Sequence, residues 1–528
     1  MSQTNFPVNA SVLAVETPDP PAAVAQPGDL NDELINTDQW TDEMVARAGI
    51  RVVDTTFVSV GGGFGSFVTV NLLRVAGLGT ESIKVLTNIE EPTQTYEYLT
   101  RVSQIPRPER LRSDSTGMPD CVWAFPSYAL REARKEKTLA PVWSVLTEPV
   151  FVDYWTPRAA MVFEGVAREA ERMRWKEMVA FGQARMVRKR VGGGYFTILT
   201  PPAGTSTTKR VAYRSQFVHI AVGYPGLKFL PDLQAYRETY GDIARLVNAY
   251  ESHEHVYESL VRKPSVLVVR GGGIVASRVL QRAMEDRWNK GAQTQIIHLF
   301  RTYIDGKNAK YGPSRRRGGG GFAYQGFNVP KGSWGGQLRD KFESLEGEQR
   351  AQLYKTLGGT HTPHRKLWLQ QSKRAREEGW YQTVQGEISE AKPTASGLIG
   401  LHIFQKNGSA GLLEANAVID CTGLEADLKE HRLLADLLNH SGIGRNVLGR
   451  LDVERTFELR NGRSGTGRLY ASGAATTGAY YAGVDSFLGL QYAALRILDD
   501  LTEVGLVSRF SAGSAVSQWW KWFRHKTI

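Results

Sequence analysis

Two glycine-rich segments constrain the fold of this chain more than any other feature. VSVGGGFGSF, at residues 59–68, follows an extended apolar stretch, and VLVVRGGGIVASR, at residues 266–278, repeats the pattern near the middle of the chain. In both places the hydrophobic pattern predicts a strand, a tight turn and a helix. A second strand completes each unit, at Ser82–Leu86 and at Thr294–Phe300. Such a β-α-β unit places parallel strands side by side, with the glycine turn at their carboxyl ends.

The first turn lies between a strand predicted at Asp54–Val60 and a buried helix predicted at Phe67–Val75. It consists of Gly61, Gly62, Gly63, Phe64, Gly65 and Ser66. In this pattern the first position permits the tight turn, the third lets a pyrophosphate approach the backbone, and a small sixth residue lets the helix pack on the strand. The helix N-terminus adds unpaired N–H groups for phosphate. The turn therefore predicts a dinucleotide site, with Thr87 standing where an acidic residue usually holds the ribose.

The second turn has the same spacing, with Gly271, Gly273 and Ala276 in the three positions. Arg301 ends the second strand of this unit, where a site for NAD would place an acidic residue, and its guanidinium suits the 2′-phosphate of NADP. Arg278, in the first helical turn, is expected to reach the same phosphate. The alternative interpretation of Arg301 and Arg278 is that they only face water, and that of each glycine segment is a loop that only reverses the chain direction. A chance match to this pattern is much less probable for two units in one chain than for a single unit.

Three more segments extend this pattern. FVHIAVGYPG, at residues 217–226, and VIDCTG, at residues 418–423, each consist of a strand that ends in a glycine turn. RLYASGA, at residues 468–474, precedes a helix predicted from Asp485. Together with the two glycine units, these segments make about residues 50–505 resemble the two-dinucleotide-binding-domain flavoproteins. That class includes pyridine-nucleotide reductases and flavin-containing monooxygenase-like enzymes.

The resemblance implies an α/β fold with two Rossmann-like dinucleotide-binding domains, in which the NAD(P) domain is inserted into a split FAD domain. FAD is then expected at the first glycine turn, at Thr87 and at the C-terminal flavin motif, where Gly473 matches the family and Ala474 replaces its usual Asp. NADPH is expected at the second glycine turn. The implied parts are a disordered tail at 1–45, an FAD domain at 46–257 and 401–510, an NAD(P) domain at 258–400, and a C-terminal tail at 511–528. A Gly- and Arg-rich stretch within the NAD(P) domain, residues 305–340, fits either a lid over the site or a disordered surface insertion.

Composition argues against several other classes of protein. Cys121 and Cys421 are the only cysteines and lie far apart in sequence, so a thiol-disulfide reductase with a close redox pair is not expected. The low number of cysteines also predicts a location in the reducing cytoplasm. No apolar run approaches the ~18 residues of a membrane span. The net charge of +11 is dispersed and accompanies no nucleic-acid-binding motif, so a nucleic-acid partner is not expected. No metal is expected either, because two histidine pairs lack the partner spacing of a metal site: His253 with His255, and His361 with His364.

These features predict an FAD-dependent oxidoreductase that is reduced by NADPH, resembles a monooxygenase and acts on a small molecule. Two alternatives remain open. One is a flavin-dependent reductase that passes electrons to a small acceptor without redox cysteines, and the other is a non-catalytic nucleotide-binding regulator. The sequence assigns no catalytic side chain, because no residue can be named as a general acid or base. The substrate and the oligomeric state stay open as well.

Overall fold

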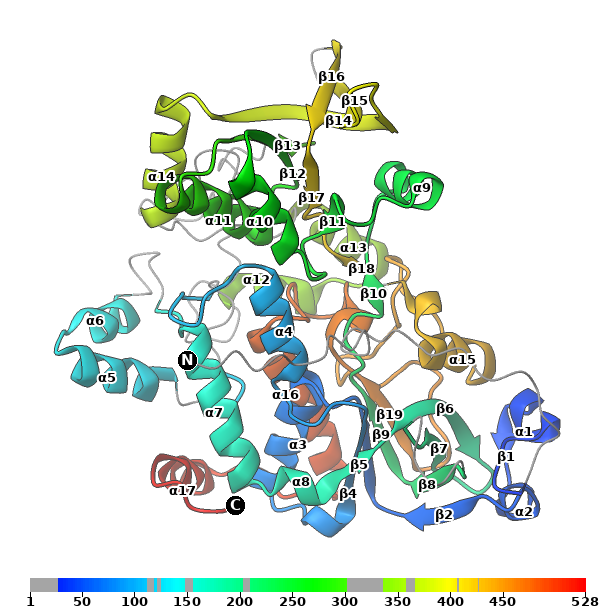
Figure 1. The fold of residues 1–528 in the computed structure, drawn as a ribbon. Coiled ribbons are helices and arrows are strands. Elements are labelled where there is room, and N and C mark those ends of the chain that lie inside the picture. The colour runs from blue at the N-terminus through cyan, green and yellow to red at the C-terminus, as the bar shows by residue number, and fades with distance from the viewer. Residues whose placement is uncertain are drawn as a thin grey trace.

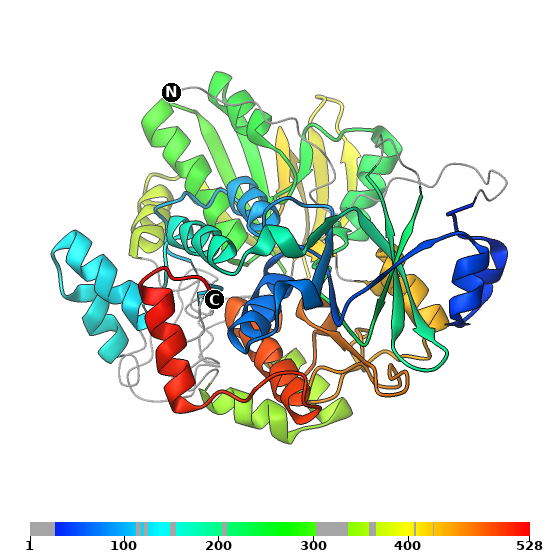
Figure 2. The same ribbon diagram turned by 90° about the horizontal axis from the view of Figure 1, so that it is seen from below.

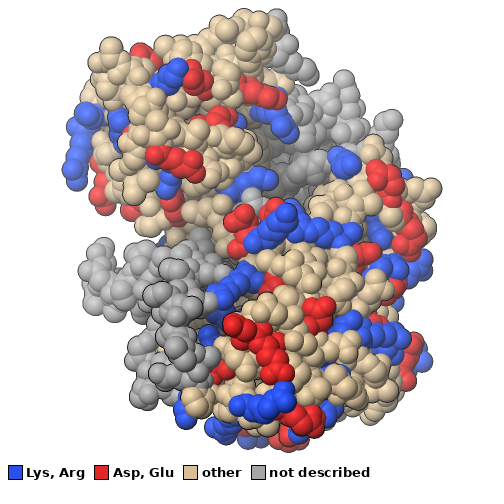
Figure 3. All heavy atoms as spheres, turned by 90° about the vertical axis from the view of Figure 1, so that its right-hand side faces the viewer, with Lys and Arg blue, Asp and Glu red and all other residues tan. Residues whose placement is uncertain are grey.

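The computed structural model describes residues 27–111, 118–120, 125–147, 155–202, 209–301, 336–357, 366–405, 408–425 and 427–528. They form two α/β bodies, one above the other in Figure 1, and a flanking sheet beside the lower body. The lower body is built on the sheet β19-β9-β3-β4-β5, the upper body on β11-β17-β12-β13-β14-β15-β16, and the flanking sheet has the order β1-β6-β7-β8-β2. On the face shown in Figure 3, basic and acidic side chains are interspersed over both bodies, as the dispersed charge of the sequence predicts.

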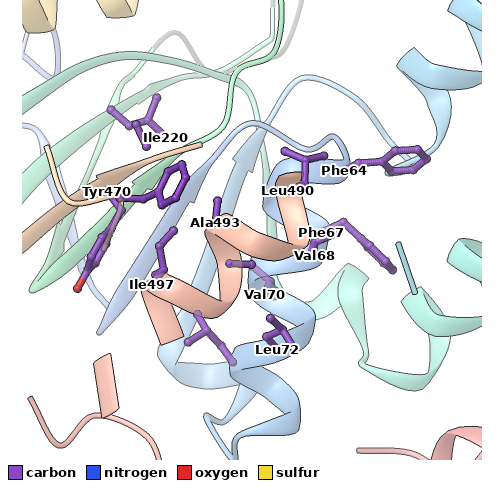
Figure 4. Close-up of a cluster of buried hydrophobic side chains, with 14 of the residues drawn as sticks. Phe64, Phe67, Val68, Val70, Leu72, Ile220, Tyr470, Leu490, Ala493 and Ile497 are labelled. Atoms are coloured by element: carbon purple, nitrogen blue, oxygen red, sulfur yellow. The ribbon is translucent and has the colours of Figure 1, made fainter. Parts of the chain in front are cut away.

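The sheet of the lower body is parallel and takes its strands from distant parts of the chain. In spatial order they are β19 (Arg468–Ala471), β9 (Phe217–Ile220), β3 (Phe57–Val60), β4 (Ile83–Thr87) and β5 (Val179–Phe181). Helix α3 (Phe64–Val75) follows β3, and α16 (Phe487–Glu503) packs against it (Figure 4). All but one residue of α3 are buried, which confirms the prediction of a buried helix. The core shared by these elements includes Phe67, Val70, Tyr470, Leu490, Ala493 and Ile497.

The strand predicted at Asp54–Val60 is two strands in two different sheets. β2 (Arg51–Asp54) is one of the two edge strands of the flanking sheet, whereas β3 lies at the centre of the lower-body sheet. Thr55 and Thr56 make the crossing: their N–H groups donate to a carbonyl at the end of β8 and to a carbonyl that precedes β4, at 3.0 and 3.2 Å. The prediction was wrong here because both sheets favour the same β-branched and aromatic residues, so the crossing leaves little mark on the sequence pattern.

The N-terminal tail prediction is wrong for residues 27–45, which fold onto the flanking sheet. This segment contributes α1 (Asp32–Asn36), β1 (Gln39–Trp40) and the start of α2 (Asp42–Arg47). The Trp40 side chain is fully buried, packs against Phe196, and donates its indole N–H to the Leu34 carbonyl at 2.9 Å. A few buried apolar side chains hold this segment on the sheet. The sequence did not reveal them, because the surrounding composition is rich in Pro, Asp and Asn. Residues 1–26 lie outside the described part of the chain.

The rest of the flanking sheet and a set of helices complete this half of the molecule. The flanking sheet also contains β6 (Gln183–Arg190), β7 (Tyr195–Thr200) and β8 (Val211–Ser215). The helices are α4 (Gln94–Val102), α5 (Phe125–Glu136), α6 (Ala140–Leu146), α7 (Ala159–Arg172), α8 (Trp175–Met178) and α15 (Arg432–His440). Helix α15 packs across β6, where the Arg188 guanidinium, which has no exposed surface, binds the Asp436 carboxylate at 2.5 and 2.9 Å.

The upper body contains the second glycine unit. Its parallel strands are β11 (Leu246–Asn248), β17 (Ala417–Asp420), β12 (Ser265–Arg270), β13 (Thr294–Phe300) and β14 (Tyr381–Pro393), and an antiparallel extension adds β15 (Ile399–Gln405) and β16 (Ala410–Ala415). The strand predicted at residues 294–300 is confirmed as β13. Helices α10 (Glu254–Arg262), α11 (Ile274–Lys290) and α14 (Lys366–Glu377) belong to this body.

The chain leaves the lower body after β9 and returns to it after β17, so the upper body is an insertion, as predicted. The outward path includes β10 (Gly226–Leu227) and α9 (Pro231–Tyr240), and β10 pairs antiparallel with β18 (Leu424–Glu425) on the return path. The strands β11, from residue 246, and β17, to residue 420, both belong to the upper-body sheet, so this body extends beyond the boundaries predicted at residues 258 and 400. Between these strands, α12 (Gly336–Ser344) and α13 (Gly347–Leu357) contact the lower body, since Glu343 of α12 accepts the Tyr492 hydroxyl and Arg350 of α13 lies over the Tyr480 ring.

The predicted C-terminal tail is a packed helix, α17 (Ala512–Phe523). Figure 2 shows it beside α5, where the buried Trp522 side chain donates to the Asp120 carboxylate at 3.2 Å and lies against Tyr128. The tail prediction was wrong because an aromatic-rich helix near a chain end still buries enough apolar surface to dock. Throughout the part of the chain that the structure describes, no helix combines the length and apolar character needed to cross a membrane.

Candidate functional site

A cavity opens at the carboxyl ends of the lower-body strands, with the first glycine turn on its wall. Every residue expected to bind FAD except Ser66 lines it: Gly61, Gly62, Gly63, Phe64, Gly65, Thr87, Gly473 and Ala474. Further lining comes from residues 182–184 at the junction of β5 and β6, residues 221–224 after β9, Ser472 and the start of α16. The structure therefore brings together residues from distant parts of the chain.

Two glycines of the first turn are required for different reasons, Gly61 by close packing and Gly63 by the open space beside it. Gly61 has a φ of +103°, and a Cβ there would collide with the Ala221 carbonyl at the end of β9. Gly63 precedes α3 and has extended backbone, and a Cβ added to it would have no atom within 4 Å. No side chain caps the N-terminus of α3, so its first N–H groups are available to an anion that enters the cavity. This open, backbone-lined space fits the pyrophosphate of a dinucleotide.

A chain of four polar side chains runs beneath the cavity. Ser59 of β3 donates to Ser66 at 2.8 Å, His219 Nδ1 lies 3.1 Å from Ser59 Oγ, and His219 Nε2 lies 2.9 Å from Ser472 Oγ. Because Ser59 gives its only hydroxyl proton to Ser66, Nδ1 carries the imidazole proton and Nε2 accepts from Ser472. Complete burial lowers the pKa of His219 to about 3, so the ring is neutral. The network holds the side chain of Ser472, a residue that lines the cavity. It also explains the serine at position 66, whose hydroxyl accepts the hydrogen bond from Ser59.

The sequence reasoning missed His219 and Ser59, although both leave a visible signal. Each is the only polar residue in a four-residue strand whose positions are all buried, FVSV and FVHI. Polar groups in such strands must find partners in the structure. Two polar residues on neighbouring central strands could therefore have been expected to meet.

At the carboxyl end of β4 the cavity lacks the acidic residue that the dinucleotide-binding pattern usually places there. The Thr87 hydroxyl accepts the N–H of Ile89 at 3.1 Å and so supports the turn after β4. Glu91, one of the two acids just beyond, pairs with Lys176 at 3.1 Å, and neither Glu90 nor Glu91 lines the cavity.

Aromatic side chains line the cavity near the starts of α3 and α16. The ring centroids of Phe64, Tyr96 and Phe487 lie 5.1–5.3 Å from one another. The helix predicted from Asp485 begins at Phe487 and is capped by Ser486, whose hydroxyl accepts the Gly489 N–H at 3.1 Å. The α16 N-terminus therefore directs its positive dipole toward this end of the cavity.

The second glycine turn repeats the geometry in the upper body. Gly271 has a φ of +127°, and a Cβ there would lie 2.8 Å from the carbonyl oxygen of Cys421. A Cβ on Gly272 would have no neighbour within 4 Å, and no side chain caps α11 at Gly273. Ala276 is completely buried, so its small side chain permits the close packing of α11 on the sheet.

The two arginines predicted to contact the 2′-phosphate lie in different environments. Arg301 directly follows β13. Its side chain is 75% exposed and its ion pair with Glu387 is long, at 3.9 Å, so the guanidinium can turn toward a ligand. The Arg278 side chain is 7% exposed and donates to the Gln104 carbonyl at 3.0 Å and to the Glu109 carboxylate at 3.1 Å. Arg278 thus attaches α11 to the segment after α4, contrary to the expectation that it reaches the phosphate.

Other candidate residues have structural partners. His253 bonds to the Glu251 carbonyl at 2.7 Å and lies 3.2 Å from the Tyr257 hydroxyl, while His255 bonds to the Ala244 carbonyl at 2.8 Å. Among the residues described here, no three His, Cys, Asp or Glu side chains gather as a metal site. His361, His364 and most of the 305–340 stretch lie outside the described residues.

The architecture is that of the two-dinucleotide-binding-domain flavoproteins. No protein-family model and no curated protein sequence matches the chain, but solved structures do. The ornithine hydroxylase PvdA from Pseudomonas aeruginosa is 16% identical, with a TM-score of 0.58 over 85% of this chain and 99% of that one. DfoA from Erwinia amylovora, a cadaverine monooxygenase solved with FAD, is 14% identical, with a TM-score of 0.62 over 87% and 98%. The ornithine N-hydroxylase KtzI from Kutzneria sp. 744 is 11% identical, with a TM-score of 0.61 over 86% and 100%. At these identities the likeness defines the fold.

Proposed function

We propose that the protein is an FAD-dependent monooxygenase, reduced by NADPH, that acts on a small amine. The observation that carries the proposal is the pair of glycine turns, each at an uncapped helix N-terminus and each with open space beside one glycine, Gly63 or Gly272. The neighbours named above act on ornithine and cadaverine, which suggests the substrate class. Bound FAD would supply the two-electron chemistry, in which NADPH reduces it and one atom of O₂ enters the substrate while the other leaves as water.

The residues of this chain would bind and shield the cofactors. Gly61 and Gly63 let the pyrophosphate approach the start of α3, and Ser472 and Gly473 hold the flavin half at the other end of the cavity. Phe64 and its aromatic neighbours exclude water from that end. In the upper body, the turn from Gly271 receives NADPH.

Cys421 favours a monooxygenase over a thiol-disulfide reductase. Its side chain is buried in the upper body against the second glycine turn, and burial raises the pKa of the thiol well above its usual value. A thiol in this state, outside the cavity of the first turn, is a poor nucleophile for disulfide exchange. We also propose a cytoplasmic location, because two cysteines far apart in sequence suit a reducing compartment.

The test begins with the purified protein, which we expect to be yellow. FAD released by heat and identified by chromatography establishes the cofactor, and anaerobic NADPH should then bleach the flavin. With oxygen and a panel of amines, including ornithine, lysine and cadaverine, mass spectrometry should find a product with one added oxygen atom. A folded, colourless protein that cannot take up FAD would overturn the proposal. NADPH oxidation without any oxygenated product would instead indicate a reductase, and FAD that NADPH does not reduce would indicate a regulator.

A further inference from the structure

His431 places a buried polar atom in the wall of the cavity. It precedes α15, its residue is 7% exposed, and it lines the cavity together with Gln183 and Ala184. Its Nδ1 atom is buried and makes no hydrogen bond to any other residue in the described part of the chain. A buried polar atom without a partner costs about 1–3 kcal/mol, so its presence calls for an explanation.

Helix α15 is held firmly, so the position of His431 does not result from a loose segment. The helix packs across β6, and the Arg188–Asp436 pair described above fastens it to that strand. Burial and the nearby charge of Arg185 lower the pKa of His431 to about 4, so the ring is neutral under ordinary conditions. A neutral imidazole offers one N–H donor and one acceptor, which suits a ribose hydroxyl or an adenine nitrogen better than a phosphate.

The location of β6 determines which half of a dinucleotide His431 would meet. In this fold the pyrophosphate lies at the helix N-terminus, and the adenosine ribose lies at the end of the second strand, here β4. β5 adjoins β4 on the side away from β19, and β6 follows directly after β5. His431 therefore lies at the adenosine end of the cavity, opposite Ser472 and the start of α16.

The usual ribose ligand is missing at this end. No acid takes the position of Thr87, whose hydroxyl accepts the Ile89 N–H, and Glu91 is paired with Lys176. We propose that His431 binds the adenosine half of FAD and supplies the polar contact that the strand end lacks. This inference rests on the proposed function, because it takes FAD as the occupant of the cavity.

The test compares FAD with FMN, which shares the isoalloxazine ring but lacks the adenosine monophosphate half. Full-length protein freed of flavin is titrated with FAD and with FMN, and binding is measured by quenching of flavin fluorescence. His431→Phe should weaken FAD binding about tenfold, as expected for one buried hydrogen bond, and should leave FMN binding unchanged. His431→Gln, which keeps a donor and an acceptor, should restore FAD affinity to within about threefold of the wild type.

The matched control is His253→Phe, which replaces another buried histidine that lies in the upper body away from the cavity. It should leave both titrations unchanged. Equal losses for FAD and FMN in His431→Phe, or an unchanged FAD affinity in a folded variant, would overturn the role of His431. If His431→Phe does not fold, His431→Ala takes its place. A wild-type FAD affinity in His431→Ala would then overturn the role of His431. A wild-type protein that binds no FAD would refute the proposed function itself, which is a different outcome.

Discussion

Replacing His219 with leucine tests the chain of polar groups beneath the cavity. The substitution removes two neutral hydrogen bonds, one to Ser59 (3.1 Å) and one from Ser472 (2.9 Å), and keeps a side chain of similar size. Each such bond contributes about 1 kcal/mol net to stability. We therefore expect the free energy of unfolding to fall by about 2 kcal/mol at about pH 7.5.

The destabilisation should disappear in mild acid. Burial lowers the pKa of His219 to about 3, compared with 6.5 for an unperturbed histidine. Below pH 6.5 the unfolded chain binds a proton that the folded chain excludes, so the contribution of His219 to stability decreases as the pH falls toward 3, by about 1.4 kcal/mol per pH unit. Leucine binds no proton. At about pH 5 the histidine has lost about 2 kcal/mol, and wild type and variant should be equally stable.

Urea unfolding followed by tryptophan fluorescence measures both values. Ser472→Ala is the matched control, because it removes one of the two hydrogen bonds but keeps the histidine, and it should retain the wild-type dependence on pH. The same stability difference between wild type and His219→Leu at both pH values would refute the reasoning, since it would mean that burial does not keep this imidazole neutral.

Three other substitutions test the cofactor sites. Gly63→Val should reduce the FAD content of the purified protein about tenfold and leave the melting temperature of the flavin-free protein nearly unchanged, because the added Cβ enters empty space; full FAD content would place the cofactor elsewhere. Arg301→Ala should weaken NADPH about ten- to hundredfold in the rate of flavin reduction and barely affect NADH, whereas equal losses would make the arginine structural. Arg278→Met breaks a buried ion pair with Glu109, so it should lower thermal stability by about 3 kcal/mol and affect both nucleotides equally; a selective loss of NADPH would show that this guanidinium reaches the phosphate.

The glycine units were predictable because their requirements are local. Gly61 and Gly271 adopt φ values of +103° and +127°, which disfavour any side chain, and the strands and helices beside them carry clear apolar periodicity. Pattern alone could not place Arg278. Its position in the first helical turn suggested the phosphate, but the face of α11 that carries it is covered by residues 104–109, which are distant in sequence.

Contacts between distant segments account for most of what the sequence concealed. His431 and Gln183 line one cavity only because α15 crosses β6, and nothing near either residue signals that crossing. The His219 network depends likewise on the pairing of β9 with β3 and β19. Trp40 and Trp522 anchor the two chain ends that composition assigned to tails, because a single buried aromatic side chain can outweigh the polar residues around it.

The nested order of the strands also affects how the protein is made. β9 ends at residue 220 and its neighbour β19 begins at residue 468, with the whole upper body between them. At about 5–20 residues per second, a ribosome needs roughly 12–50 seconds to bridge that gap. For this time one edge of β9 has no partner strand, and the emerging chain offers a site for wrong pairing or for chaperones. The upper body has all its strands before β19 is synthesised, so it is free to fold first and bring the two ends of the gap close together.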